Sequence, residues 1–320
     1  MDDHHRLGIP TPFDVGRVNC YVITGSELTL VDPGPSTEAA YEKLSAGLGE
    51  HGRAVVDVDR VLITHPHMDH FGLANRVVEA SGARAVAHRD AAGILADPET
   101  HLQREQAFFE PFLEFMGVPD EVTETAITLP EAFRNYQEPL ELDRELTDGE
   151  NVGIDVDLTA VHMLGHAPGS VCFVDPTGGF AYTGDHVLPD TTPNPLVTIA
   201  PDTDDQRTRS LPGYLDSLEK LSAFDAGIGY GGHGDPISDL PTRIREILDH
   251  HHDRRERVAG LLAEMGPTTA HDLMQRMFPE LPATEVFPGI SEVVGHFDLL
   301  EDAGRVEITE ENGIRLYDHR

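Results

Sequence analysis

The chain has 320 residues, which is enough for one large domain or two modest ones, and its formal net charge of −34 comes from 57 Asp and Glu against 23 Lys and Arg. A surface this negative repels nucleic acid and anionic membranes, and no apolar run is long enough to span a bilayer. The acidic residues are spread along the chain, and only Lys43 and Lys220 are lysines. We therefore expect a halophilic protein whose self-repulsion is screened by concentrated salt.

The N-terminal residues and the cysteines both indicate a cytoplasmic location. Met1–Arg6 is polar, and no apolar segment of the signal-peptide kind follows it. Cys20 and Cys172 each lie in an apolar run, which predicts buried thiols in a reducing compartment. Because the chain has 18 histidines and 2 cysteines, a metal site would have to use imidazole and carboxylate ligands.

Short apolar runs alternate with helix-like segments through about residue 235, which predicts an α/β fold of sheets covered by helices. The short Gly25-Ser26 turn predicts antiparallel pairing of the first two strands. The expected strands are Cys20–Thr24, Leu28–Asp32, Arg60–Thr64, Arg84–His88, Leu158–Met163, Val171–Asp175, Phe180–Gly184 and Gly227–Gly231. The expected helices are Thr37–Leu48, Leu73–Ala80 and Tyr214–Leu221.

The segment from about residue 101 to residue 146 interrupts this alternation. Within it, Gln103–Met116 is rich in Phe and Glu and predicts an amphipathic helix. The apolar face of this helix could pack into the core or roof a pocket, and we favour packing.

A change of composition near Asp235-Pro236 predicts a domain boundary. We expect one domain over residues 1–240, and a linker helix plus a small winged-helix-like domain over residues 241–320. The linker helix is expected over Pro241–Met265. The small domain is expected to consist of two helices and a hairpin: Thr269–Phe278, Ile290–Ala303, and the strands Arg305–Thr309 and Ile314–Tyr317.

A cluster of three histidines and one aspartate, His65-Pro66-His67-Met68-Asp69-His70, follows the strand expected over Arg60–Thr64. Ligands gather at the carboxyl ends of strands in α/β sheets. The alternating His65 and His67 can reach one ion from an extended loop, whereas the adjacent Asp69 and His70 point elsewhere. The spacing therefore favours two metal sites that share one loop.

Three later segments carry one further ligand type each beside glycines, which allow a close approach of the backbone. His166 lies in a Gly- and Pro-rich turn, Asp185 follows the strand Phe180–Gly184, and His233 is flanked by glycines. Taken singly, each is more often an ordinary turn residue. Together with the 65–70 cluster they are hard to explain as packing alone.

In their order along the chain, these motifs resemble those of the metallo-β-lactamase superfamily of binuclear hydrolases, over about residues 13–240. Leu30–Gly34 is similar to the first strand-end motif of that superfamily. Thr183–Pro189, Thr192–Asn194 and the winged-helix tail resemble the glyoxalase-II-like branch, particularly its lactamase-beta-2-like proteins. The resemblance implies a four-layer αββα sandwich.

The resemblance also implies a role for each site residue. The first metal would be held by His65, His67 and His166, and the second by Asp69, His70 and His233. Asp185 would bridge the two ions, and Asp32 would orient a ligand by a hydrogen bond. His162 and His186 match no ligand position.

Two divalent ions about 3.5–4 Å apart can hold a bridging hydroxide, because metal binding lowers the pKa of water to about 7. That hydroxide would attack a carbonyl or phosphoryl centre, and Asp69 is expected to align it. The ligand types favour Zn2+, although iron and manganese accept the same ligands. Neither cysteine lies beside a base, which disfavours thiol catalysis.

Three functions compete at this point: hydrolysis of a small ester, thioester or lactone, a metal-dependent ribonuclease of the lactamase-beta-2-like type, and a non-enzymatic binding module. Val258–Arg320 has 12 acidic residues and 4 arginines, and Ile290–Ala303 has no Lys or Arg. A reader of nucleic acid needs basic side chains, so charge disfavours a nucleic-acid partner. We expect a small-molecule substrate, no membrane partner, and a tail that packs within the chain or forms a homodimer.

Overall fold

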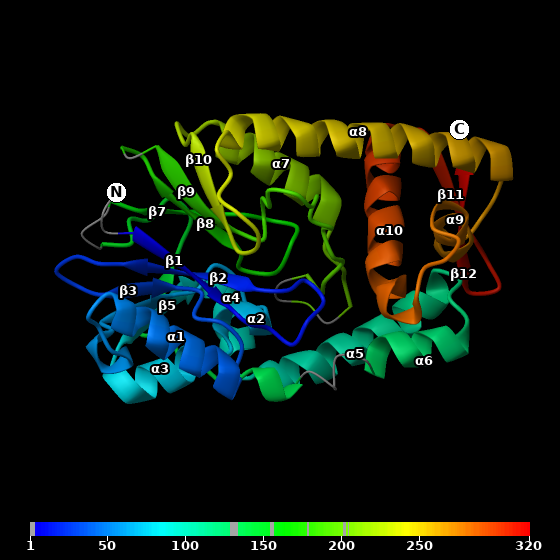
Figure 1. Cartoon of the computed structure of the whole chain (residues 1–320). Helices are drawn as coiled ribbons and strands as arrows, with labels where there is room; N and C mark the ends of the chain where they lie inside the picture. The colour runs from blue at the N-terminus through cyan, green and yellow to red at the C-terminus, as the bar shows by residue number, and fades with distance from the viewer. Residues whose placement is uncertain (1–3, 129–133, 154–156, 178, 201–202, 204) are drawn as a thin grey trace. The chain divides into compact units, whose positions relative to one another are not determined.

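A computed structural model of the chain describes residues 4–128, 134–153, 157–177, 179–200, 203 and 205–320 (Figure 1). The chain divides into two compact units. Unit 1 comprises Met1–His101, Arg134–Pro193 and Ser217–Ile244, and unit 2 comprises Leu102–Phe133, Asn194–Asp216 and Arg245–Arg320. The boundary expected at residue 240 lies close to the end of unit 1, but unit 2 also takes in two segments from earlier in the chain. Residues 1–3 of the polar N-terminus lie outside the described residues.

Unit 1 contains a six-stranded sheet in the order β1-β2-β3-β4-β5-β6. Its strands are β1 (His4–Ile9), β2 (Val18–Ile23), β3 (Thr29–Val31), β4 (Arg60–Leu62), β5 (Arg84–His88) and β6 (Arg144–Leu146). β1, β2 and β3 pair antiparallel, and β3 through β6 pair parallel. The antiparallel pairing expected across the Gly25-Ser26 turn is therefore confirmed, with Tyr21 opposite Val31.

The second sheet of unit 1 has four strands in the order β10-β9-β8-β7. Its strands are β7 (Thr159–His162), β8 (Val171–Asp175), β9 (Phe180–Gly184) and β10 (Ile228–Gly231). β10 runs parallel to β9, and the other two pairs are antiparallel. All four strands coincide with predicted ones to within one residue at each end.

Side chains of the first sheet alternate between two buried layers. Val22, Leu30 and Val61 pack with residues of three helices on the outer face. The helices are α1 (Glu38–Glu50), α3 (Ala74–Ser81) and α4 (Arg89–Ala96). The neighbouring residues Val31 and Leu62 point the other way and pack against residues of the second sheet. Both faces of this sheet are thus buried, as expected for a largely parallel sheet.

Helical residues also cover the outer side of the second sheet. Ser217, in α7 (Ser210–Ser222), accepts a hydrogen bond from Leu164 N. A Cβ atom at Gly229 would lie 3.0 Å from Leu240, the first residue of α8 (Leu240–Met265). Unit 1 therefore contains the expected order of layers, helix, sheet, sheet and helix.

Unit 2 is built from helices and one hairpin around its own apolar core. Besides residues of α7 and α8, its elements are α5 (Pro98–Phe115), α6 (Asp120–Thr128), the short η3 (Ala283–Glu285), α9 (Ala270–Met277), α10 (Val286–Asp302), β11 (Val306–Glu311) and β12 (Ile314–His319). The hairpin turns at Asn312 and Gly313, which both have positive φ. The expected order of helix, helix and hairpin is confirmed, whereas the assignment as a winged-helix module stays a prediction.

Several elements differ from the sequence expectations. The strands β1 and β6 were not predicted, because His4–Ile9 is half polar and β6 has only three residues, which carry little periodicity. The helices α4 and α6 and the short helices α2 (Met68–Phe71) and η1 (Val55–Asp57) were also not predicted. The expected amphipathic helix is α5, whose Phe109 and Leu113 lie in the core of unit 2.

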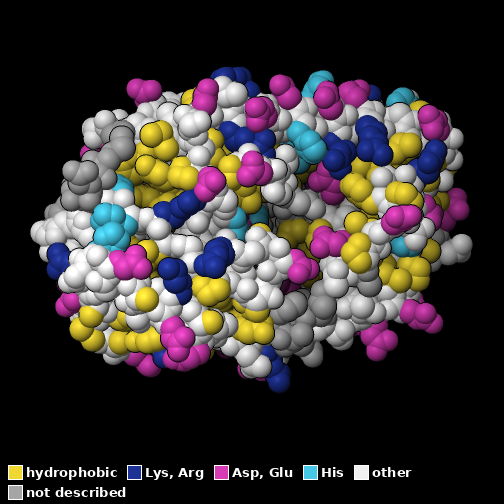
Figure 2. Space-filling view, in the orientation of Figure 1, with side chains coloured by type: hydrophobic (Ala, Val, Ile, Leu, Met, Phe, Trp, Pro, Cys, Tyr) yellow, Lys and Arg dark blue, Asp and Glu magenta, His cyan; other side chains and the backbone are white. Residues whose placement is uncertain are grey.

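No helix within the described ranges is both long and apolar enough to cross a membrane. On the face shown in Figure 2, Asp and Glu side chains are scattered over the surface and do not gather in one patch. This distribution agrees with the diffuse spread of acidic residues along the sequence.

The net charge of −34 predicts that salt stabilises the fold, because screening reduces the repulsion between carboxylates. Lowering KCl from about 2 M to about 0.1 M should lower the free energy of unfolding by about 2 kcal/mol, which for a chain of 320 residues corresponds to a fall in Tm of roughly 3 °C. Differential scanning calorimetry measures this. A Tm that stays constant or rises as salt is removed would contradict the halophilic interpretation.

Candidate metal centre

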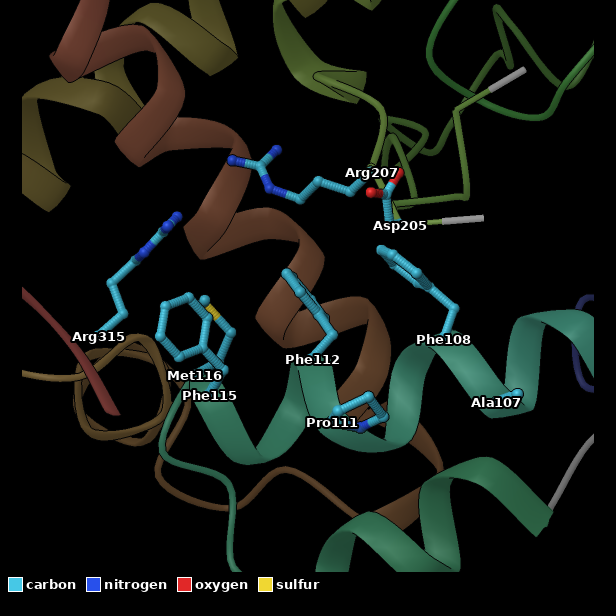
Figure 3. A pocket seen from close by; sticks show the side chains of 9 residues that line it. All are labelled: Ala107, Phe108, Pro111, Phe112, Phe115, Met116, Asp205, Arg207 and Arg315. Carbon is cyan, nitrogen blue, oxygen red and sulfur yellow. The ribbon is translucent and has the colours of Figure 1, made fainter. Parts of the chain in front are cut away.

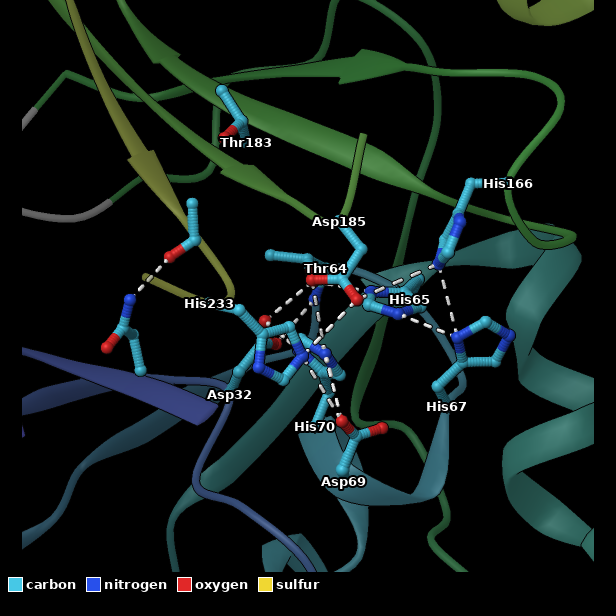
Figure 4. A network of polar contacts seen from close by, with 12 residues as sticks. Asp32, Thr64, His65, His67, Asp69, His70, His166, Thr183, Asp185 and His233 are labelled. Carbon is cyan, nitrogen blue, oxygen red and sulfur yellow. Dashed lines mark hydrogen bonds and ion pairs between the residues drawn. The ribbon is translucent and has the colours of Figure 1, made fainter. Parts of the chain in front are cut away.

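All the candidate ligands lie in unit 1, at or just after the ends of strands (Figure 4). After β4 the chain continues through Thr64–His67, and His67 is the N-terminal cap of the short helix α2. The imidazole of His70 lies beside that of His65, with ring centroids 4.1 Å apart, whereas the ring of His67 lies against that of His166. The loop nevertheless supplies ligand atoms to two groups of side chains, one with His65 and His67 and one with Asp69 and His70.

The first group brings together His65, His67 and His166. His65 Nε2 lies 3.1 Å from His67 Nδ1, and His166 Nε2 lies 3.2 Å from the same atom. Protons alone satisfy three converging ring nitrogens poorly, because each shared proton joins only two of them. One ion with tetrahedral preference would accept all three lone pairs at once.

The second group brings together Asp69, His70 and His233. His233 Nε2 lies 3.3 Å from Asp69 Oδ2, and His70 Nε2 lies 3.7 Å from the same oxygen. One imidazole or carboxylate atom from each residue falls within 4.8 Å of the other two. This is the combination expected for a second cation.

Asp185 lies between the two groups. Its Oδ1 is 3.4 Å from His70 Nε2, and its Oδ2 is 3.4 Å from His233 Nε2 and 4.0 Å from His166 Nε2. Asp185 therefore faces histidines of both groups, which is the position of a bridging carboxylate.

The donor atoms fit bound cations by a second criterion. His70 Nε2, Asp185 Oδ1 and His233 Nε2 are buried and have no hydrogen-bond partner. A buried polar atom without a partner costs about 1–3 kcal/mol. Three such atoms that face one another indicate that the site is built for positive charge.

The protonation states agree with this arrangement. Burial, together with the neighbouring His67, lowers the pKa of His166 to about 3, and burial lowers that of His65 well below its usual value. Burial also acts to lower the pKa of His233, but the carboxylates of Asp185 and Asp69 outweigh it and raise the pKa to about 9. His65 and His166 thus offer neutral imidazoles, and the carboxylates of the second group attract a cation in place of protons.

Asp32 holds His70 in the orientation that the site needs. Its Oδ1 accepts a hydrogen bond from Thr64 N at 2.8 Å, and its Oδ2 accepts one from Thr64 Oγ1 at 2.6 Å. The same Oδ2 lies 2.9 Å from His70 Nδ1. This contact places a proton of His70 on Nδ1, so that Nε2, on the side of Asp185, would be the nitrogen that binds an ion.

The loop that carries His233 is held by residues near the N-terminus. His233 Nδ1 donates to Arg17 O at 2.8 Å. The side chain of Asn19 donates to Gly231 O and Gly234 O, and Tyr21 Oη donates to Gly231 O. Sequence reasoning missed these three positions, although a polar Asn19 inside an apolar strand was a usable signal.

A glycine next to His233 leaves room for the site. A Cβ atom at Gly232 would fall against Asp185 Oδ1 and within 2.5 Å of His70 Cε1. The expectation that glycines at the strand ends allow a close approach is therefore confirmed here.

The two histidines that match no ligand position lie outside these groups. His186 is buried, and burial lowers its pKa well below the usual value. The ring of His162 stacks on that of His88 with centroids 3.9 Å apart.

Unit 2 has a separate cavity of about 470 Å³ (Figure 3). Phe108, Phe112 and Phe115 from α5 form an apolar side, and Arg207 and Arg315 lie opposite. Arg207 is paired with Asp298, and Arg315 lies over the ring of Phe115. No histidine, cysteine or serine is among the described residues that line the cavity, so we place the chemistry at the histidine and aspartate groups of unit 1.

The sequence matches a family model over residues 13–233, and that family is described as the metallo-beta-lactamase superfamily. A probable metallo-hydrolase of Bacillus subtilis, YqjP, is 30% identical over 304 residues, which cover 94% of this chain and 92% of the relative. The matched range contains every candidate ligand in unit 1.

Two further relatives extend the comparison. A crystal structure of a metallo-beta-lactamase family protein from Thermus thermophilus superposes with a TM-score of 0.83 at 28% identity, covering 100% of this chain and 99% of that one. The atrochrysone carboxyl ACP thioesterase of Aspergillus fumigatus is 24% identical over 289 residues, which cover 86% of this chain and 73% of the relative.

Replacing Gly232 by Ala should weaken metal binding by at least about tenfold while the fold is retained, because the added methyl group displaces Asp185 or His70. Zn2+ titration followed by calorimetry measures the loss. Gly227→Ala is the matched control, since the nearest atom to its Cβ would be Gly179 O at 3.7 Å. Equal Zn2+ affinity in both variants would show that metal binding does not depend on the space left by Gly232.

Replacing Asp32 by Asn should lower metal affinity by about 10–100-fold, because the new amide would donate to His70 Nδ1 and move the imidazole proton to Nε2. Asn tolerates the positive φ of 54° at this position. Asp143→Asn is the control, because Asp143 accepts from Ala85 N and does not contact the candidate ligands. Unchanged affinity in Asp32→Asn would refute the orienting role.

Proposed function

This chain belongs to the metallo-beta-lactamase superfamily, and from that premise we propose that it is a binuclear metal-dependent hydrolase of a small ester, thioester or lactone, of the glyoxalase-II-like kind. One observation carries the proposal. The carboxylate of Asp185, whose side chain is 12% exposed, faces histidines of two separate ligand groups at 3.4–4.0 Å.

The proposed ligand roles follow the two groups. His65, His67 and His166 would hold one divalent ion, and Asp69, His70 and His233 the other, with Asp185 shared. Zn2+ is the ion that we propose, because imidazole and carboxylate ligands in a compact site suit it. Asp32 would act through His70 by fixing its tautomer.

Two divalent ions bound here would polarise the substrate carbonyl and lower the pKa of a water to about 7. Asp69 would hold that water in line for attack. Figure 4 shows one oxygen of Asp69 turned toward His70 and His233 and the other turned away from them, which leaves a carboxylate oxygen to accept a hydrogen bond. The neutral imidazoles of His65 and His166 would keep their lone pairs available at neutral pH.

The chain offers no competing thiol nucleophile. Cys20 and Cys172 are both buried, and burial raises the pKa of each thiol far above neutrality. A thiolate at either position is therefore disfavoured. Hydrolysis by an activated water needs no such nucleophile.

Among the proposed substrates we favour a thioester, because the related Aspergillus fumigatus protein is named as an acyl-carrier-protein thioesterase. The cytoplasmic location, the halophilic character, the homodimer and the winged-helix nature of the C-terminal elements stay predictions.

The proposal is tested with His65→Ala. The wild-type chain should bind at least about two divalent ions and hydrolyse one of a panel of acyl thioesters, esters and lactones in concentrated salt. Loss of one nitrogen ligand should abolish turnover while circular dichroism stays native. His51→Ala, at an exposed position, is the control and should keep full activity.

Full activity of His65→Ala would refute the site. Cleavage of single-stranded RNA by the wild type, with no hydrolysis of any acyl compound, would instead support the ribonuclease alternative.

A further inference from the structure

Two histidines and a glutamate meet in the core of unit 2, where no catalytic role has been assigned. His251 lies on α8, and Glu292 and His296 lie four residues apart on α10, so both point to the same side of that helix. Their exposed fractions are 1%, 7% and 0%. One ligand atom of each residue lies within 4.8 Å of the other two.

The two imidazoles of this cluster have no hydrogen-bond partner at any ring nitrogen. The nearest polar approach is His296 Nε2 to Glu292 Oε1, at 3.3 Å. The rings of His251 and His296 lie with centroids 5.7 Å apart. Burying unsatisfied imidazoles is costly, and apolar side chains would fill the same space without that cost. The pattern therefore indicates that something else completes the cluster.

Arg254 fixes the carboxylate of the cluster. Its Nη1 donates to Glu292 Oε1 at 3.1 Å, and its own side chain is 20% exposed. Carboxylates that bind metals are commonly held by such an outer hydrogen bond. A carboxylate has enough lone pairs to keep this bond and to bind an ion as well.

The protonation states suit ligands. Burial lowers the pKa of His251 to about 4, so its imidazole is neutral at neutral pH. Burial acts to raise the pKa of Glu292, but the contact with His296 and nearby positive charge outweigh it and lower the pKa to about 2. Metal binding requires neutral imidazole and ionised carboxylate, and these are the forms that His251 and Glu292 favour.

We propose that His251, Glu292 and His296 bind one divalent transition-metal ion in unit 2. Two imidazoles and one carboxylate suit Zn2+, Co2+, Ni2+ or Fe2+ and leave further positions for water. The ion would join α8 to α10 and would stabilise unit 2 by mass action. This site shares no residue with the centre in unit 1, so it stands independently of the proposed hydrolase function.

A comparison within unit 1 shows why the cluster of unit 2 is the stronger candidate. His88, Asp90 and His162 also place ligand atoms within 4.8 Å of one another. His88 Nδ1, however, already accepts a hydrogen bond from Asp90 N, and the side chain of Asp90 is 28% exposed. The position of His88 is therefore explained by its role as the cap of α4. No such contact among the described residues explains the buried histidines of the cluster in unit 2.

Zn2+ and Co2+ are the probes for the proposed site. The chains are saturated with Zn2+, free metal is removed by gel filtration, and the bound zinc is measured by elemental analysis. Glu292→Gln and His251→Gln should each hold one zinc ion per chain fewer than wild type. His252→Gln, which changes an exposed histidine one residue away on α8, should hold the wild-type number. Co2+ should raise the Tm of wild type more than that of Glu292→Gln.

A measurement on the wild-type chain tests the proposal even if the variants fail to fold. Crystals of Zn2+-loaded wild-type protein, recorded at the zinc absorption edge, should show an anomalous peak between His251 and His296. No peak at that position, or equal zinc content in wild type and well-folded Glu292→Gln, would overturn the proposal. Neither result depends on hydrolytic activity, so failure here is separate from failure of the proposed function.

Discussion

The candidate metal centre of unit 1 depends on the placement of one largely buried carboxylate among imidazoles. Asp185 lies 3.4 Å from ring nitrogens of both His70 and His233 and 4.0 Å from His166 Nε2. Those side chains come from four different connections of the two sheets. Because the carboxylate and the unpartnered nitrogens are costly to bury separately, the arrangement makes physical sense only if positive charge is held between them. The proposed pair of ions supplies that charge.

The scaffold fixes this cluster through contacts outside it. Asp32, at the end of β3, sets the tautomer of His70, while the backbone carbonyl of Arg17 does the same for His233. Gly232 leaves the space that Asp185 occupies. These supports belong to strand ends that the sheets bring side by side. The two buried sheets therefore hold these supporting residues, and through them the ligand atoms, in fixed positions.

The spacing of the 65–70 segment favoured two ligand groups, because one ion cannot easily take all four of its side chains, and the binding of two ions stays a prediction. The apolar runs predicted eight strands, since buried strands carry a strong local signal. The partners of Asn19 and Arg17 could not be found in this way, because they lie more than 200 positions away in the sequence, although the polar Asn19 within an apolar strand was itself a usable signal. His251 and His296 were missed for the same reason: only the packing of α8 against α10 brings them together.

The shared carboxylate is tested most directly by X-ray absorption spectroscopy of the zinc-loaded chain. The spectrum should contain a metal–metal scattering path of about 3.5–4 Å in addition to nitrogen and oxygen neighbours, and this path should disappear in His70→Ala. A spectrum of fully loaded wild-type protein that shows light-atom neighbours alone would mean that the ions do not share Asp185, and the binuclear interpretation of this centre would be wrong.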